Sequence, residues 1–291
     1  MSEQAPVGRR AATTVPATDG IHVSVCSRGD NGPAVVLVHG IPGSGAAWEP
    51  VAARLAATAR VLVPDLVGFG QSSRPDSLDV LHADGQARAL AAVLDRLAVG
   101  SAAVVGHDFG APVALALYRL RPDLVNGLGL LATNTFTDTP VPFPLSTVRW
   151  PVLGRLAGRA LFSGPSLRMM LHRGMGRPRR RLDPAAYVGD RGQRRAIARI
   201  FAGSLRHLAE LYAPVQETLA KVDVPAFVLW GDRDPFFTVE QGQRTAASIA
   251  GAELTVLSGA GHFIPEERPD EVADAITRVL SRVVRTPVEQ P

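Results

Sequence analysis

The sequence predicts an α/β protein with a doubly wound, mostly parallel sheet and a helical cap inserted after the sixth strand. Short β-branched runs alternate with alanine- and leucine-rich stretches along most of the 291-residue chain, which is the order of a sheet with crossover helices. Several of these runs are apolar at every position, as in parallel strands that helices cover on both faces. The alternation stops between residues 138 and 215, where the sequence indicates helices only.

Short apolar runs mark the expected strands. The runs AVVLV and AFVLW show no alternation of polar and apolar residues, which favours strands buried on both faces. The expected strands are His22–Val25, Ala34–Val38, Val61–Val63, Ala102–Val105, Leu128–Leu131, Ala226–Trp230 and Glu253–Leu257. Helices are expected between them at residues 46–58, 85–98, 110–120, 239–249 and 268–283.

The domain organisation follows from the interrupted alternation. We expect the sheet domain to comprise residues 21–137 and 216–285, and the cap to comprise residues 138–215. Such a cap lies over the carboxyl edge of the sheet, where α/β folds bind ligands. Residues 1–20 and 286–291 are expected to be flexible tails.

Composition excludes several classes of protein. No apolar run approaches the roughly 18 residues that a membrane-spanning helix needs, so neither an integral membrane protein nor a membrane partner is predicted. The first 20 residues contain no apolar core of a secretory signal, which favours a cytoplasmic location. Cys26 is the only cysteine, so an internal disulfide and a multi-cysteine metal site are excluded.

The charge distribution argues against nucleic acid as a partner. Although the net charge is +4, residues 140–213 hold 14 arginines against three acidic residues, and the rest of the chain is net acidic. The positive charge therefore belongs to the cap, either as a solvated helix face or as a surface that steers substrate or binds a partner. The expected partner is a small-molecule substrate, and the sequence does not determine the oligomeric state.

The sequence AAVVGHDFGAP at 102–112 is the most informative motif. A strand leads through Gly-x-Asp-x-Gly into a helix, so Asp108 occupies the centre of a nucleophile elbow. Gly106 and Gly110 fit this turn because side chains there would collide where strand and helix backbones approach. The alternative is that Asp108 only caps the helix.

A second motif, VHGIPGSGAAW at 38–48, follows the strand at 34–38. If this loop lies beside the elbow, the backbone N–H groups of Ile41 and Phe109 converge on one developing oxyanion. We interpret His39 as a turn residue rather than a base.

Two further strands end in polar residues. The strand AFVLW continues into GDRDPF, and the strand at 253–257 continues into SGAGHFIPEERP. We therefore predict His262 as a base and Asp234 as the acid that orients it, in the chain order nucleophile, acid, histidine. Asp232 is the competing acid. We favour Asp234 because the spacing from Gly231 to Asp234 leaves room for a turn, after which the side chain points back across the sheet.

With these residues assembled, residues 21–284 resemble the α/β-hydrolase superfamily, and more narrowly its aspartate-nucleophile branch of epoxide hydrolases and haloalkane dehalogenases. The resemblance implies that Asp108 attacks a saturated carbon to form an alkyl ester. It implies that His262 then activates the water that hydrolyses this ester, with Asp234 stabilising the imidazole. No metal or other cofactor is implied, because the chain supplies the nucleophile, the base and the oxyanion donors.

The leaving group separates the members of this branch. An epoxide needs a proton, usually from cap tyrosines, whereas a halide needs N–H donors, typically a tryptophan after the nucleophile and an asparagine or second tryptophan. Phe109 and Ile41 stand at two of the positions where dehalogenases carry these halide-binding N–H side chains. Their presence favours epoxide hydrolysis over dehalogenation. Among the cap residues, Tyr212 is the preferred candidate donor, and Tyr187 and Trp150 are the other candidates. The alternative for each is a role in helix packing only. A non-catalytic ligand-binding protein on this scaffold is the remaining alternative.

Overall fold

Eight strands form one mostly parallel sheet in the computed structural model, which describes residues 12–18, 20–141, 143–150, 153–176, 187 and 190–285. The strand order is β1-β2-β4-β3-β5-β6-β7-β8, and only the pairs β1–β2 and β2–β4 are antiparallel. The strands are β1 Thr13–Pro16, β2 His22–Arg28, β3 Ala34–Val38, β4 Arg60–Pro64, β5 Ala102–His107, β6 Val125–Leu131, β7 Ala226–Gly231 and β8 Glu253–Leu257. The predicted doubly wound α/β class is confirmed.

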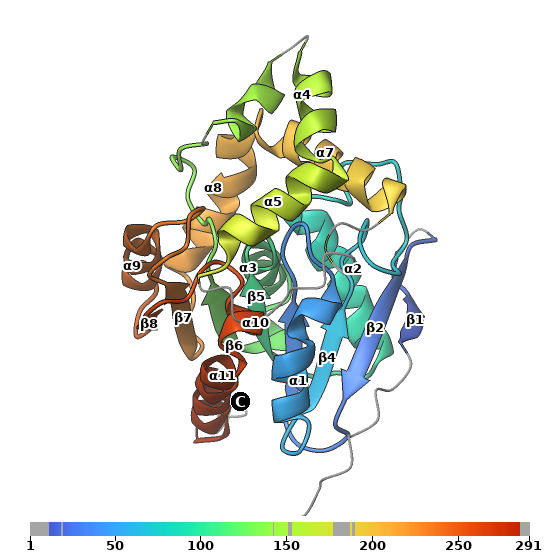
Figure 1. Cartoon of the computed structure of the whole chain (residues 1–291). Coiled ribbons are helices and arrows are strands. Elements are labelled where there is room, and N and C mark those ends of the chain that lie inside the picture. Colours follow the sequence, from blue (N-terminus) through green and yellow to red (C-terminus); the bar gives the residue numbers. More distant parts are fainter. Residues whose placement is uncertain are drawn as a thin grey trace, which may run out of the picture.

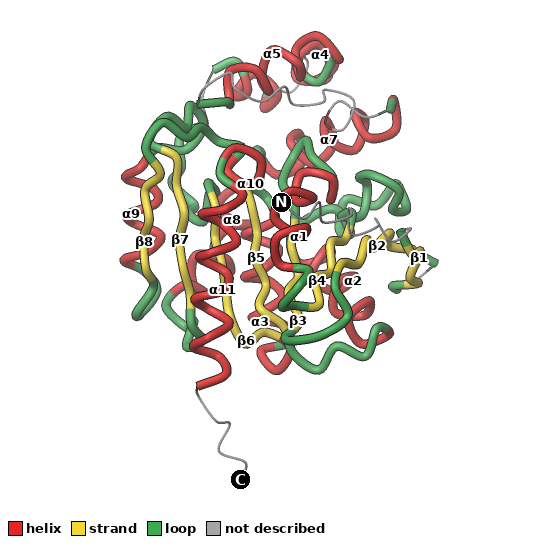
Figure 2. Tube along the Cα trace, turned by 60° about the horizontal axis from the view of Figure 1, so that its bottom comes forward, coloured by secondary structure: helices red, strands yellow, loops and turns green. Residues whose placement is uncertain are grey.

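Helices cover both faces of the sheet (Figures 1 and 2). Helices α1 and α11 pack on one face, and α2 and α3 pack on the other. All six residues of β5 are buried between these layers, which accounts for its continuous small and apolar sequence. The covering helices are α1 Glu49–Leu55, α2 Ala83–Arg96, α3 Gly110–Leu120, α9 Val239–Ala247, α10 Ile264–Glu267 and α11 Pro269–Arg285.

The N-terminal segment is a correction to the sequence-based expectation. Residues 1–20 were expected to be a flexible tail, but Thr13–Pro16 forms strand β1 at the edge of the sheet, antiparallel to β2. Val15 is buried opposite Val23, while its two threonine neighbours are exposed. This single buried valine is too short an apolar pattern to identify a strand from sequence. Residues 1–11 and the expected tail at 286–291 lie outside the described residues.

The strand β1 also brings the number of strands before the helical insertion to six. Between β6 and β7 the described chain forms helices only, which lie above the carboxyl edge of the sheet (Figure 1). We refer to them as the helical insertion: the short 3₁₀ helix η3 Leu145–Arg149, α4 Gly154–Leu161, α5 Gly164–Gly174, α7 Arg191–Ser204 and α8 Leu208–Leu219. No helix in the described ranges combines the length and apolar character needed to cross a membrane.

Candidate active site

Asp108 lies on a strained turn between β5 and α3. Its φ of +51° is in the left-handed region, which costs a non-glycine residue roughly 1–2 kcal/mol. A Cβ atom at Gly106 would lie 2.3 Å from the backbone of Gly110, and one at Gly110 would lie 2.2 Å from the carbonyl oxygen of Val38. The two glycines thus allow β5, α3 and β3 to approach closely enough to hold Asp108 above the sheet.

His262 and Asp234 form a buried pair beside this turn. The Nδ1 atom of His262 lies 2.9 Å from Oδ2 of Asp234, and Oδ1 of Asp234 accepts the backbone N–H groups of Phe236 (2.8 Å) and Phe237 (3.1 Å). These bonds fix Asp234, whose side chain is fully buried, so that it orients the imidazole. The Nε2 atom of His262 then faces Asp108, at 3.8 Å from Oδ2.

The site shifts the pKa values of both facing groups upward. Burial raises the pKa of the Asp108 carboxyl, against the opposing effects of His262 and the N–H groups of Ile41 and Phe109. For His262, burial acts to lower the pKa, but Asp234, Asp108 and Glu267 outweigh it and raise the pKa above its ordinary value of 6.5. Burial thus makes Asp108 a weaker acid. The carboxylates around His262 make the imidazole a stronger base.

The two predicted backbone donors lie on the carboxylate of Asp108. The N–H of Ile41 donates to Oδ1 at 2.7 Å, and the N–H of Phe109 also hydrogen-bonds the carboxylate. Gly40 allows this approach, because a Cβ atom there would lie 2.4 Å from the Cβ of Asp108. The loop after β3 and the elbow after β5 therefore each supply one N–H group to the carboxylate of Asp108.

Two neighbouring residues that sequence analysis set aside have structural contacts. The Nε2 atom of His39 accepts the N–H of Leu66 at 2.9 Å, so its Nδ1–H donates to the carbonyl of Gly40 at 2.9 Å. Both ring nitrogens are occupied, and burial lowers the pKa of this histidine. Asp232, the competing acid, accepts the N–H of Gly259 at 2.7 Å, between the loops that follow β7 and β8.

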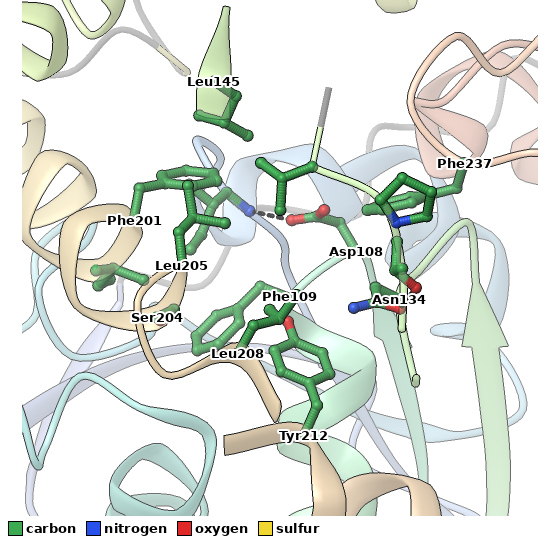
Figure 3. A pocket seen from close by; sticks show the side chains of 15 residues that line it. Asp108, Phe109, Asn134, Leu145, Phe201, Ser204, Leu205, Leu208, Tyr212 and Phe237 are labelled. Atoms are coloured by element: carbon green, nitrogen blue, oxygen red, sulfur yellow. Dashed lines mark hydrogen bonds between the residues drawn. The ribbon is translucent and has the colours of Figure 1, made fainter. Parts of the chain in front are cut away.

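A mostly apolar cavity opens in front of Asp108 (Figure 3). Its volume is about 120 Å³. Its walls come from both the sheet loops and the helical insertion: Ile41, Asp108, Phe109, Asn134, Thr139, Pro140, Val141, Leu145, Ile200, Phe201, Ser204, Leu205, Leu208, Tyr212 and Phe237. None of these lining residues is an arginine or a tryptophan. The cavity can therefore hold an apolar group against a single carboxylate.

Tyr212 is the candidate cap donor that reaches this cavity. It extends from α8, and its hydroxyl end points into the space shared with Asp108 (Figure 3). Burial, together with the charge of Asp108, raises the pKa of its hydroxyl above the ordinary value of 10.0. The phenol is therefore protonated at neutral pH and is able to donate.

The structure places the other two candidates outside the cavity. Trp150 follows η3 with 52% of its surface exposed. Tyr187 is buried, but its hydroxyl donates to the carboxylate of Glu266, and its ring packs edge-on against Phe263. Neither side chain lines the cavity, because Trp150 projects to solvent and Tyr187 is held by Glu266 and Phe263, so the expectation that either residue serves as leaving-group donor is corrected.

Sequence analysis missed Asn134 and Ser204, which both line the cavity. Asn134 follows β6, and its side-chain amide is held by hydrogen bonds with the backbone N–H (3.0 Å) and carbonyl (3.1 Å) of Phe136. A polar residue after a strand end is the same signal that identified Asp234, so Asn134 was within reach of sequence reasoning. Ser204 ends α7, and no local pattern distinguishes it from the other polar residues of the insertion.

Comparison with known proteins places this geometry in a family. Residues 33–269 match the model of the alpha/beta hydrolase fold family. Epoxide hydrolase A of Mycobacterium tuberculosis is 27% identical over 307 residues, which cover 91% of this chain and 95% of the relative. Haloalkane dehalogenase 2 of Mycobacterium bovis is 29% identical over 262 residues, which cover 84% and 87%.

Solved structures of both kinds share the fold. The haloalkane dehalogenase DbeA from Bradyrhizobium elkani superposes with a TM-score of 0.80 at 20% identity, covering 94% of this chain and 99% of that one. The epoxide hydrolase CorEH superposes with a TM-score of 0.78 at 23% identity, with the same two coverages. The chain belongs to the alpha/beta hydrolase fold family, and its relatives include epoxide hydrolases and haloalkane dehalogenases.

Proposed function

We propose that this protein hydrolyses a substrate at a saturated carbon through a covalent ester of Asp108, and that the substrate is an epoxide, which yields a diol. The observation that carries the proposal is the arrangement of a carboxylate, an imidazole and a phenol around one cavity. Asp108 and Tyr212 both line the cavity, and Nε2 of His262 lies 3.8 Å from Oδ2 of Asp108.

The first step uses the two oxygens of Asp108 differently. Oδ1 is held by the N–H of Ile41, whereas Oδ2 faces His262 beyond hydrogen-bond distance and keeps its lone pairs available. Oδ2 attacks a ring carbon of the epoxide, the C–O bond of the ring breaks, and Tyr212 gives its proton to the departing oxygen. The attacking group is the carboxylate form of Asp108, which needs no base to remove a proton first.

The second step releases the product. His262 takes a proton from a water molecule, which attacks the carbonyl carbon of the Asp108 ester. Negative charge develops on the carbonyl oxygen of the ester, which the N–H groups of Ile41 and Phe109 stabilise. Asp234 stabilises the imidazolium that has formed. The tetrahedral intermediate then expels the product oxygen, which takes its proton from the imidazolium and leaves as the diol, and the proton that remains on the attacking hydroxyl restores the phenol of Tyr212.

The side chains around the cavity favour an epoxide over a halide. A leaving halide is stabilised by N–H donors, and no tryptophan lines the cavity, with phenylalanine directly after the nucleophile. A departing alkoxide requires a proton, which the Tyr212 hydroxyl can supply. Dehalogenation remains the second candidate because a haloalkane dehalogenase is among the relatives of similar identity.

Oxygen isotopes test the ester route directly. In a single turnover in heavy-oxygen water, the new oxygen of the diol should come from Asp108, and the label should enter the Asp108 carboxylate. Label found only in the product would exclude the ester.

Trapping tests the roles and separates an enzyme from a ligand-binding protein. His262→Gln should accumulate a covalent adduct on Asp108, visible as added protein mass with an epoxide. His207→Gln is a matched control, since His207 is exposed and pairs with Glu210. Absence of both adduct and turnover across epoxides and bromoalkanes would favour the non-catalytic alternative.

A further inference from the structure

The backbone of His262 is held from two sides. Its carbonyl accepts a hydrogen bond from Nε2 of His107 in β5, at 2.8 Å. Its N–H donates to the carbonyl of Gly174, at 2.7 Å, where α5 ends. The core sheet therefore fixes one side of the peptide, and the helical insertion fixes the other.

Glu267 reinforces the contact on the insertion side. Its Oε2 atom accepts the N–H of Gly176 in the insertion, at 2.9 Å, and the N–H of Gly261, at 3.0 Å. Gly261 immediately precedes His262, so one carboxylate joins the insertion to the loop that carries the imidazole. Bonds from N–H groups to an ionised carboxylate are among the stronger hydrogen bonds in proteins.

The backbones that Glu267 joins are in direct contact. A Cβ atom at Gly176 would lie 2.3 Å from the carbonyl oxygen of Gly259, and one at Gly261 would lie 2.2 Å from that of Gly174. Because no side chain separates the two segments, a displacement of the insertion at this point is transmitted to the His262 loop.

We propose that Glu267 is a positioning residue that couples the seating of the helical insertion to the orientation of His262. This inference rests on the proposed function, in which His262 activates the water that hydrolyses the ester. The same insertion supplies Tyr212 and the cavity walls, so Glu267 links the formation of the cavity to the alignment of the base.

The charges around His262 support this coupling. Four titratable groups face or adjoin its ring: Asp234 after β7, Asp108 after β5, His107 in β5, and Glu267 at the end of α10. Burial lowers the pKa of His107 well below its ordinary value, so His107 is neutral. The three carboxylates raise the pKa of His262 against the effect of burial, and Glu267 is the one of the three outside the predicted triad.

The decisive variant is Glu267→Gln, which removes the charge and keeps the size of the side chain. We expect the NMR titration midpoint of the His262 ring to fall, and ester hydrolysis to slow about tenfold, so that the adduct accumulates. The ring signal is assigned by its absence in His262→Gln. Glu271→Gln is the matched control, because it removes a half-exposed carboxylate on the neighbouring helix α11, where Glu271 pairs only loosely with Arg268.

A purely structural role for Glu267 predicts a different result, namely lower thermal stability with an unchanged His262 midpoint. A midpoint in Glu267→Gln equal to that in Glu271→Gln overturns the proposal. The titration requires no substrate, so its outcome is independent of whether the protein opens epoxides.

A second variant covers the case in which Glu267→Gln does not fold. Gly176→Ala retains every charge but forces the insertion away from the His262 loop. We expect slower ester hydrolysis with the same adduct accumulation. Unchanged ester hydrolysis in a folded Gly176→Ala protein overturns the coupling.

Discussion

The Nε2 atom of His262 lies 3.8 Å from Oδ2 of Asp108, although both side chains are largely buried. This separation exceeds hydrogen-bond length, so the two groups do not hold one proton between them. The carboxylate therefore retains a free oxygen on the cavity side, and the imidazole is directed at the carbon that an ester of Asp108 would present to water.

Replacing Asp108 with asparagine should abolish turnover and preserve the fold. The amide is a poor nucleophile, so kcat should fall by at least about a thousandfold. Asparagine tolerates the left-handed backbone at this position, and it removes the cost of burying a charge that the raised pKa of Asp108 indicates. We expect a melting temperature equal to or above that of the wild type. Asp76→Asn, at a fully exposed position, serves as the control, and turnover in Asp108→Asn near the wild-type rate would contradict the assignment.

Replacing Tyr212 with phenylalanine should separate the two candidate substrates. Without the phenol, epoxide opening should slow by about a hundredfold, because the departing oxygen lacks its proton donor. Ester formation from a bromoalkane requires no proton and should change little. Tyr187→Phe should leave both rates unaltered, since that hydroxyl is bound to Glu266 outside the cavity. Equal rates of epoxide opening in Tyr212→Phe and wild type would exclude Tyr212 as the donor.

The pH dependence should report the raised pKa of His262. Because the neutral imidazole is the base, the rate of ester hydrolysis should rise with pH as His262 loses its proton. Asp234 and Glu267 still act to raise the pKa of His262 in the ester, whereas the charge of Asp108 is then absent. The same pKa shift affects stability with the opposite trend, because the folded state favours protonated His262. This contribution to the free energy of unfolding is complete below pH 6.5 and is lost as the pH rises through the pKa of the folded state. The stability difference between wild type and His262→Gln, measured by urea unfolding, should therefore shrink as pH increases. A difference that grows with pH would show that the pKa is lowered.

Gly110→Ala should destabilise the protein more than Gly100→Ala. The added Cβ would lie 2.2 Å from the carbonyl oxygen of Val38, so the contact between β3 and α3 must open, at a cost of about 2–4 kcal/mol. Gly100→Ala is the matched control, because a Cβ there meets nothing within 4 Å. Chemical unfolding of the two variants tests this, and equal midpoints would mean that the elbow relaxes without cost.

Most of the candidate site could be predicted because its residues follow strand ends. Asp108, Asp234 and His262 lie in the turn and loops that follow β5, β7 and β8, and parallel strands bring their carboxyl ends to one edge. Local sequence therefore determines where such side chains emerge, before any contact is known. The glycines around Asp108 add the same kind of information, since they mark points where backbones touch.

The sequence by itself determined the sheet, the elbow and the order along the chain of Asp108, Asp234 and His262. Only the tertiary structure decided which insertion residues face the cavity, placing Tyr212 inside and Tyr187 and Trp150 outside. It alone revealed the contact of Glu267 with both Gly176 and Gly261. The physical reason is that a strand end has one direction set by the sheet. The exposed and buried sides of an insertion helix, in contrast, depend on what it packs against.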